Sequence, residues 1–270
     1  MLALLSRKPL SPCLLARLSL SRRFAIKLLT LDIETSPNLA HVWGLWQQNV
    51  GLSQLLESGE VISFAAKWYG EEEVEFFSSF HDTKPFMVQR AHELLSEADA
   101  VIHFNGARFD IPHLNREFVE IGMTPPSPYA QIDLLKVVKK NFRFPSNKLD
   151  YVTKALGLDH KIHNSGHTLW VKCMAGDFQA WEEMKAYNMQ DVVITEQLYD
   201  RLLPWITGHP STGLHDETEG HSCPNCGSAE LEKRGKAYTS VSVFQRYRCV
   251  CGKWSRGNKR LSSVEIQGVK

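Results

Sequence analysis

The chain has few cysteines and no long apolar run, and each shortage excludes a class of protein. Six cysteines among 270 residues are too few for a disulfide-rich scaffold. No stretch reaches the roughly 18 apolar residues that a membrane-crossing helix needs, so we expect no membrane association. The hydrophobic share of 43% and the charged share of 23% exclude a wholly disordered chain or a coiled-coil rod. The length predicts one large domain, with room for a small module.

Acidic residues are missing from the first 31 positions, although the formal net charge of the chain is only +1. Residues 32–220 carry 15 basic and 27 acidic groups, and residues 221–270 carry ten basic and three acidic groups. An acidic middle between basic flanks fits a carboxylate metal site beside segments that contact phosphates. Charge drifts along many chains, however, so the pattern by itself favours a nucleic-acid partner only weakly.

Residues 1–25 are rich in Leu, Ser and Arg. They lack the apolar stretch of a secretory signal, because Arg7, Lys8 and Arg17 interrupt it. The composition suits a mitochondrial presequence, and equally a non-native extension of the reading frame. We expect a poorly ordered leader, and a cytoplasmic protein of a bacterial or phage-infected cell, with the mitochondrion as the alternative.

Residues 26–206 have the pattern of one α/β domain. The apolar run 26–33 predicts a buried strand, and the β-rich runs 61–70 and 73–80 predict a hairpin. We also expect a strand over 99–106 and helices over 84–98, 111–122, 146–158 and 177–203. The segment 130–140 could be a strand or a helix. Strands followed by strands mixed with helices predict a mixed sheet. Residues 207–220 are typical of a linker, and a module is expected over 221–270.

Four acidic residues stand where their side chains can converge. Asp32 and Glu34 lie two apart on the first predicted strand, so both project from one face. Two carboxylates side by side repel each other, and a divalent cation relieves that repulsion. Asp110 follows the strand over 99–106, and Asp191 lies four residues after Tyr187 on one helix face. Taken singly, Asp110 also fits a helix cap and Asp191 a solvated helix acid.

Three motifs carry a resemblance to a known group of nucleases. They are Asp32-Ile33-Glu34, then the segment from Asn105 to Asp110, then Tyr187-Asn188-Met189-Gln190-Asp191. They resemble the exonuclease motifs of the DEDD superfamily, and the tyrosine resembles the DEDDy branch, which includes the proofreading domains of family B DNA polymerases. The chain is also similar to YprB-type, ribonuclease H-like exonucleases over roughly residues 27–205.

The resemblance implies a fold, a reaction and a set of ligands. The fold is ribonuclease H-like, a mixed five-stranded sheet flanked by helices, and the reaction is 3′→5′ exonucleolytic hydrolysis. Asp32, Glu34, Asp110 and Asp191 would bind two Mg²⁺ or Mn²⁺ ions, for which carboxylate oxygens are suitable ligands. Tyr187 would orient or deprotonate the attacking water. Two ions about 3.5–4 Å apart can stabilise both the attacking and the leaving oxygen.

Other residues are candidates for contacts to the substrate. Asn105 and Phe109 resemble positions that contact the terminal nucleotide in the family. Trp43, with Trp46 three residues later, could stack on a base, although core or subdomain packing is the slightly better interpretation. Lys148 and Lys161 are candidate phosphate contacts.

Two further polar residues near the motifs are assigned lesser roles. Asp133 is expected to have a structural or supporting role rather than to bind metal. His167 is expected in a loop, as a structural or substrate-contacting residue.

Four of the six cysteines lie in the last fifth of the chain, as Cys223-x-x-Cys226 and Cys249-x-Cys251. Each pair is followed by glycine, and the arrangement resembles a zinc ribbon with one structural Zn²⁺. The second pair is one residue shorter than usual, so His221 is an alternative ligand, and a disulfide is an alternative to zinc. Cys13 and Cys173 are not expected to bind the ion.

The predicted ribbon interleaves basic and aromatic residues, which is a plausible platform for nucleic acid. The expected partner is therefore nucleic acid, with single-stranded DNA favoured, and replication or repair proteins are possible partners. Two other functions stay open at this point. One is a non-catalytic nucleic-acid adaptor, and the other is a structure-selective endonuclease on the same fold.

Overall fold

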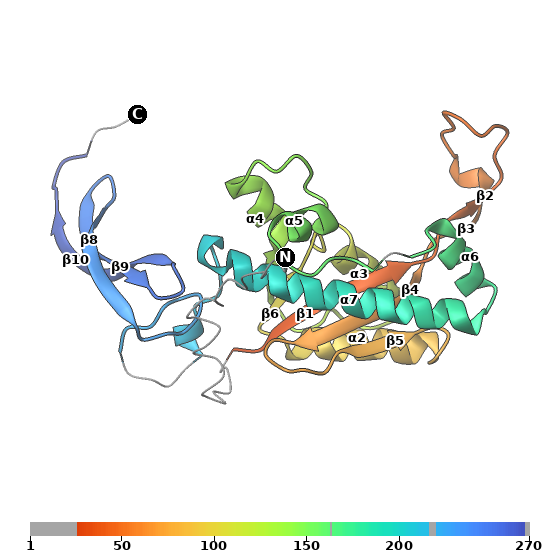
Figure 1. Ribbon diagram of the computed structural model, residues 1–270, viewed down its shortest axis with the longest axis horizontal. Coiled ribbons are helices and arrows are strands. Elements are labelled where there is room, and N and C mark those ends of the chain that lie inside the picture. The colour runs from red at the N-terminus through yellow and green to blue at the C-terminus, as the bar shows by residue number, and fades with distance from the viewer. Residues whose placement is uncertain (1–25, 163, 216–219, 268–270) are drawn as a thin grey trace, which may run out of the picture. The chain divides into compact units, whose positions relative to one another are not determined.

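The computed structural model describes residues 26–162, 164–215 and 220–267, and the leader expected over 1–25 lies outside them. The chain forms two compact units (Figure 1). One spans Lys27–Leu202, and the other contains the described residues from Leu203 onward. Among the described residues, no helix combines the length and apolar character needed to span a membrane.

A mixed five-stranded sheet forms the centre of the first unit. Its strands lie in the order β5 (Glu75–Ser78), β4 (Val61–Trp68), β1 (Leu28–Thr35), β6 (Ala100–His103) and β7 (Ala130–Asp133). The β4–β5 hairpin is antiparallel, as is β1 against β4, whereas β6 is parallel to both β1 and β7. The predicted hairpin and the predicted mixed sheet are both confirmed.

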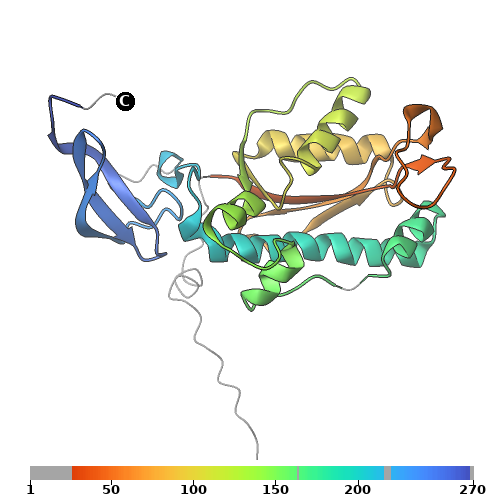
Figure 2. The ribbon, with the colours of Figure 1, turned by 90° about the horizontal axis from the view of Figure 1, so that it is seen from above.

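Helices cover both faces of this sheet, which Figure 2 shows edge-on. Helices α2 (Lys84–Glu97) and α3 (Asp110–Glu120) pack on one face, and the long helix α7 (Phe178–Leu202) packs on the other. Leu29, Leu31 and Ile33 of β1 enter the core under α2 and α3. Because side chains alternate along a strand, Asp32 and Glu34 therefore face α7.

The segment 130–140, ambiguous in sequence, divides into β7 and helix α4 (Leu134–Asn141). The carboxylate of Asp133 marks the division, since it caps α4 by accepting the N–H groups of Leu135 and Lys136. Helix α5 spans Leu149–Ala155. Helix α6 spans His167–Met174, so the expectation that His167 lies in a loop is wrong. Gly166, at φ +62°, allows the chain to turn into that helix.

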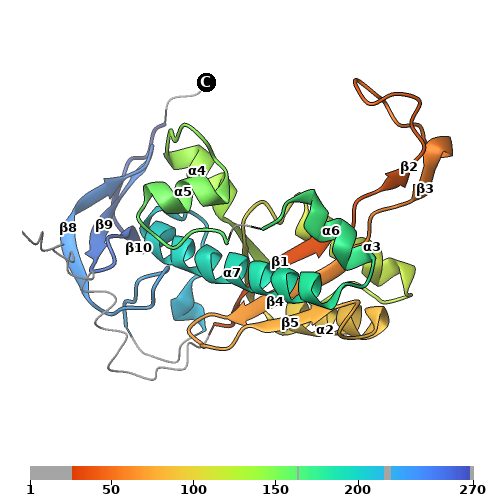
Figure 3. The same cartoon turned by 45° about the vertical axis from the view of Figure 1, so that its right-hand side comes forward.

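A small hairpin extends beyond the C-terminal end of β1 (Figure 3). Its strands are β2 (Leu39–Ala40) and β3 (Leu55–Glu57), and a 3₁₀ turn over Leu52–Gln54 precedes β3. Trp43 and Trp46 lie in its loop and are 97% and 84% exposed. Core packing, the alternative that we considered for these tryptophans, is therefore wrong for both.

The second unit is built on a three-stranded antiparallel sheet in the order β10 (Trp254–Ser263), β9 (Ser242–Cys249) and β8 (Leu231–Tyr238). Two 3₁₀ turns, Leu203–Trp205 and Thr212–Leu214, precede it. The Thr212 hydroxyl donates to the carbonyl of Cys223 at 2.9 Å, and the Asn225 amide donates to the carbonyl of Leu203 at 2.7 Å. Part of the segment expected to be a linker thus packs against the cysteine loop.

Candidate functional site

Three carboxylates meet between β1 and α7. One oxygen from each of Asp32, Glu34 and Asp191 lies within 4.8 Å of the others; we call this group the acid cluster. Asp191 is buried, and its Oδ1 is among the buried side-chain atoms that have no hydrogen-bond partner. Hard oxygen ligands with an unsatisfied, buried lone pair fit a divalent cation such as Mg²⁺ or Mn²⁺.

Burial and mutual repulsion disfavour the charged forms of these acids. Burial raises the pKa of Asp32 well above its usual range, and the charges of Asp110 and Asp191 raise it further. Burial, followed by the charge of Asp191, raises the pKa of Glu34 to about 8. Burial also raises the pKa of Asp191. A divalent cation bound among these groups would offset that repulsion, because opposite charge favours the ionised form.

Asp110 lies beside this cluster rather than within it. It is the first residue of α3, is buried, and accepts the backbone N–H of Ile33 on β1 at 3.1 Å. Burial raises its pKa to about 6, even though that hydrogen bond acts in the opposite direction. The structure therefore brings three of the four predicted acids within 4.8 Å of one another. The role of Asp110 as a metal ligand stays a prediction.

Tyr187 and Lys161 lie against the cluster. The Lys161 ammonium donates to the Tyr187 hydroxyl at 2.8 Å and forms an ion pair with Asp191. We expected Lys161 to contact a phosphate, whereas the structure places it on the acid cluster. Burial, with the charge of Asp191, raises the pKa of Tyr187 to about 12. At neutral pH the phenol is therefore protonated and available as a hydrogen-bond donor.

Asn188 fixes the orientation of Asp32. Its amide donates to Asp32 Oδ2 at 2.8 Å, and its carbonyl accepts the Ser63 hydroxyl at 3.3 Å. Asn188 lies within the third sequence motif, but no role was predicted for it. A signal was available, because Asn188 and Asp191 are three apart on a helix and so share a face. A fully buried amide with both ends hydrogen-bonded holds its partner in one position.

The second unit gathers the four clustered cysteines. Cys223 and Cys251 have sulfur atoms 3.8 Å apart, and those of Cys226 and Cys249 are 3.5 Å apart. All four sulfurs lie within 4.8 Å of one another. Tetrahedral zinc with Zn–S bonds of about 2.3 Å places its sulfurs roughly 3.8 Å apart, whereas a disulfide needs about 2.05 Å. The cluster fits zinc and contains no disulfide.

The short Cys249-x-Cys251 spacing does not prevent this arrangement. Gly252, at φ +93°, turns the chain back, and its N–H donates to the carbonyl of Cys249 at 2.9 Å. The ring of His221 instead packs edge-on against Tyr247, with centroids 5.8 Å apart, and this histidine is not in the cysteine group.

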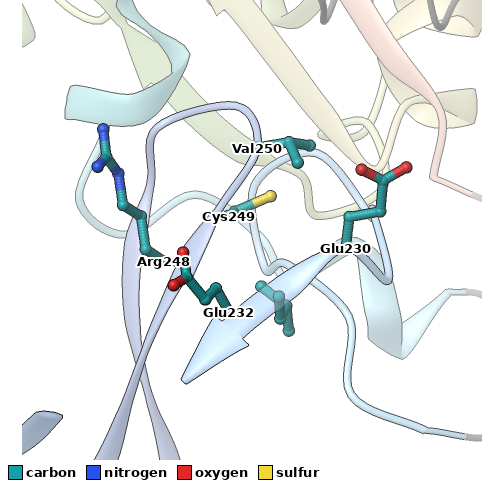
Figure 4. A pocket seen from close by; sticks show the side chains of 6 residues that line it. Glu230, Glu232, Arg248, Cys249 and Val250 are labelled. Atoms are coloured by element: carbon teal, nitrogen blue, oxygen red, sulfur yellow. The ribbon is translucent and has the colours of Figure 1, made fainter. Parts of the chain in front are cut away.

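A pocket on the second unit lies beside Cys249 (Figure 4). It is lined by Glu230, Leu231, Glu232, Arg248, Cys249 and Val250. The pocket and the acid cluster share no residue.

Comparison with known proteins identifies the family of the first unit. A family model described as the RNase H superfamily matches residues 30–203. The chain belongs to the RNase H superfamily. A comparison with curated proteins finds no match. The RNase H assignment places Asp32, Glu34 and Asp191 inside the matched region, and the cysteine cluster outside it.

The RNase H-like fold also occurs in a solved polymerase. The chain is similar to the family B DNA polymerase from the hyperthermophilic archaeon Pyrobaculum calidifontis, with a TM-score of 0.52 and 17% sequence identity. The match covers 80% of this chain and 31% of the polymerase. The chain thus spans about a third of the polymerase, and at this identity the likeness concerns the fold.

The RNase H-like unit places the predicted substrate contacts at separate points. Asn105 has φ +74° at the end of β6, and its N–H donates to Asp133 Oδ1 at 3.1 Å. Phe109 is exposed and packs against His113, with ring centroids 4.5 Å apart. Lys148 is exposed at the start of α5, and Trp43 lies on the β2–β3 hairpin. Their contacts with a substrate stay predictions.

The metal-free protein is expected to lose stability as the pH rises from about 5 to about 8. The pKa of Glu34 rises from an ordinary 4.5 to about 8 on folding, so the folded state holds this proton more tightly than the unfolded state. Stability is therefore greatest below the unfolded pKa and is lost as the pH climbs towards the folded value. Calorimetric melting temperatures of the RNase H-like unit, measured without added Mg²⁺ or Mn²⁺ and without chelator, test this. Glu34→Gln should flatten the decline, and a melting temperature that rises across the window would contradict the repulsion.

Proposed function

We propose that this protein is a metal-dependent 3′→5′ exonuclease that hydrolyses phosphodiester bonds of single-stranded nucleic acid, with DNA favoured. The observation that carries the proposal is the acid cluster, three carboxylates with the Tyr187 hydroxyl beside them. Membership of the RNase H superfamily supports a nuclease reaction, and the sequence resemblance to DEDDy exonucleases supports its direction.

The proposed chemistry divides among the residues of the cluster. Asp32, Glu34 and Asp191, with Asp110 as the fourth predicted ligand, would hold two Mg²⁺ or Mn²⁺ ions. Such ions, when bound, supply a nucleophile at neutral pH and neutralise charge on the phosphate. Asn188 keeps Asp32 in one orientation through its 2.8 Å hydrogen bond, so this ligand is preorganised. The role proposed for the four cysteines is a structural zinc site in the second unit.

Tyr187 is proposed to position the attacking water rather than to deprotonate it. A phenol with a pKa of about 12 holds its proton at neutral pH and can donate one hydrogen bond while Lys161 donates to its oxygen. In the metal-free protein Lys161 also pairs with Asp191, and it must move away from that carboxylate when an ion binds there.

Tyr187→Phe is expected to lower single-turnover cleavage by about 10²–10⁴-fold, the range for a positioned proton-handling group. Manganese affinity should stay unchanged, because no carboxylate is altered. Tyr151→Phe is the matched control, since Tyr151 lies on α5 and is 39% exposed. A Tyr187→Phe rate equal to that of the control would remove the tyrosine from the mechanism.

The proposal is tested with 5′-labelled linear DNA and RNA oligomers of matched sequence and with circular single-stranded DNA. With Mg²⁺ we expect the linear strands to shorten stepwise from the 3′ end and the circle to persist. EDTA should stop the reaction. Cleavage of the circle would favour an endonuclease, and binding without cleavage in either metal would favour an adaptor.

A further inference from the structure

One face of the three-stranded sheet is open to solvent along β9 and β10. Arg246 and Arg248 on β9, and Trp254 and Arg256 on β10, are exposed, whereas the intervening Tyr247 is half-buried. Strand register pairs Trp254 with Arg248 and Arg256 with Arg246. Paired residues, and alternate residues of one strand, share a face. These four side chains therefore lie together.

Two more residues extend this surface, because Arg260 is paired with Phe244 farther along the same strands. We call the set Phe244, Arg246, Arg248, Trp254, Arg256 and Arg260 the arginine face. Figure 4 shows Arg248 extending away from Cys249, its neighbour on β9. Because neighbouring side chains of a strand point to opposite faces, Arg248 and Cys249 lie on different sides of β9. The arginine face and the cysteine cluster are therefore on opposite sides of this strand.

Three guanidinium groups of this face already lie over its aromatic rings. The Arg256 guanidinium carbon lies 4.1 Å from the centroid of the Phe244 ring. Those of Arg246 and Arg248 lie 4.9 Å and 5.7 Å from the centroid of the Trp254 ring. The indole is still 47% exposed. Planar groups held in this way can be extended by a nucleobase, since bases stack on both aromatic rings and guanidinium planes.

The charge of the face is strongly positive. The face contains four arginines. The strand register places one acid, Glu232, opposite Arg248, and Glu232 forms an ion pair with Arg234 at 2.9 Å. Arginine remains charged at any physiological pH and pairs with phosphate through two parallel hydrogen bonds. A polyanion with exposed planar groups complements both features.

We propose that the arginine face is a binding site for single-stranded nucleic acid, with a base stacked on Trp254 and phosphates paired with Arg246, Arg248 and Arg256. The choice of nucleic acid as the ligand rests on the proposed function. The binding itself does not, because it requires no hydrolysis. The arginine face would be a second binding site for the nucleic acid, and it shares no residue with the acid cluster.

The test is fluorescence anisotropy of a labelled DNA strand of about 12 nucleotides, within the range of site sizes of single-strand binding folds. The full chain carrying Asp32→Asn is used without chelator and without added Mg²⁺ or Mn²⁺, so that the cysteine cluster keeps its zinc and the result does not depend on catalysis. Trp254→Ala should weaken binding roughly 5- to 150-fold, the effect of losing one base stack. Arg246→Ala with Arg256→Ala should lower the salt slope by about 1.4, at roughly 0.7 per phosphate contact on a single strand.

The matched control is Lys233→Ala with Lys236→Ala, which removes the same charge from exposed positions on β8. These lysines are paired with Tyr247 and Gln245, so they lie on the opposite face of the sheet. Their loss should change the affinity for DNA less than 3-fold, because only screened, long-range attraction to the phosphates is removed. Equal losses in the two double variants would show attraction by net charge only and would overturn the proposal.

Two further outcomes would also overturn it. One is tighter binding of a duplex of the same sequence, and the other is equal competition by poly-glutamate, which would indicate an acidic protein partner. Zinc content and far-ultraviolet circular dichroism establish that each variant is folded. If Trp254→Ala loses zinc, Arg246→Lys with Arg256→Lys decides instead. It keeps the charge but removes the planar groups, and it should weaken binding with an unchanged salt slope.

Discussion

Asp32→Asn is expected to lower metal-dependent cleavage by about 10³-fold or more. Several kcal/mol of charge stabilisation depend on the bound ions, and each 1.36 kcal/mol changes a rate about tenfold. The same change should raise the melting temperature of the metal-free protein, because Asp110, Asp191 and Glu34 all repel the charged form of Asp32. Loss of activity together with a gain in stability distinguishes a ligand from a residue that supports the fold.

Glu93→Gln is the control for this experiment. Glu93 lies on α2, on the opposite side of the sheet from the acid cluster, in a surface ion pair with Arg90. Its loss should leave the cleavage rate unchanged and should not raise the melting temperature, because surface pairs contribute about 0–1 kcal/mol. Wild-type cleavage by Asp32→Asn would remove Asp32 from the site.

Cys226→Ser is expected to abolish zinc binding and to unfold the second unit while the RNase H-like unit stays folded. Structural zinc sites contribute about 10–16 kcal/mol to folding, far more than the sparse apolar core of a three-stranded sheet can replace. The two core clusters of the RNase H-like unit contain residues from Leu29 to Tyr187 and none from the second unit, so its melting transition should persist. Zinc per chain is measured by mass spectrometry on protein purified reduced and without chelator.

Cys173→Ala provides the comparison. Cys173 is a buried thiol on α6 and is not among the four clustered cysteines, so this variant should retain one zinc per chain. If the unaltered protein contains no zinc, the cysteine cluster does not have the role that its sulfur spacing indicates.

Local sequence pattern was sufficient to predict the centre of the fold. The apolar run before Asp32 required a buried strand, and alternation along it required Asp32 and Glu34 to share a face. The structure has both features, because β1 is central in the sheet and its odd-numbered side chains fill the core. The division of 130–140 was not predictable from periodicity, since it depends on one cap, the Asp133 carboxylate.

Contacts between parts of the chain that are distant in sequence could not be predicted from local sequence pattern. Lys161 is 30 residues from Asp191, and no periodicity relates the two. Trp43 and Trp46 had the spacing of an apolar stripe, but the β2–β3 hairpin carries them away from any core. The Ser63–Asn188–Asp32 chain of hydrogen bonds joins β4, α7 and β1, so it exists only once the tertiary structure has formed.

The central claim is that the acid cluster holds catalytic divalent ions, and anomalous scattering from Mn²⁺-soaked crystals of the unaltered protein tests it most directly. Our account predicts two manganese peaks about 3.5–4 Å apart, bounded by Asp32, Glu34 and Asp191, with the Lys161 ammonium moved away from Asp191. Crystals with manganese bound elsewhere, or with Lys161 still paired to Asp191 and no peak beside it at saturating Mn²⁺, would contradict the account.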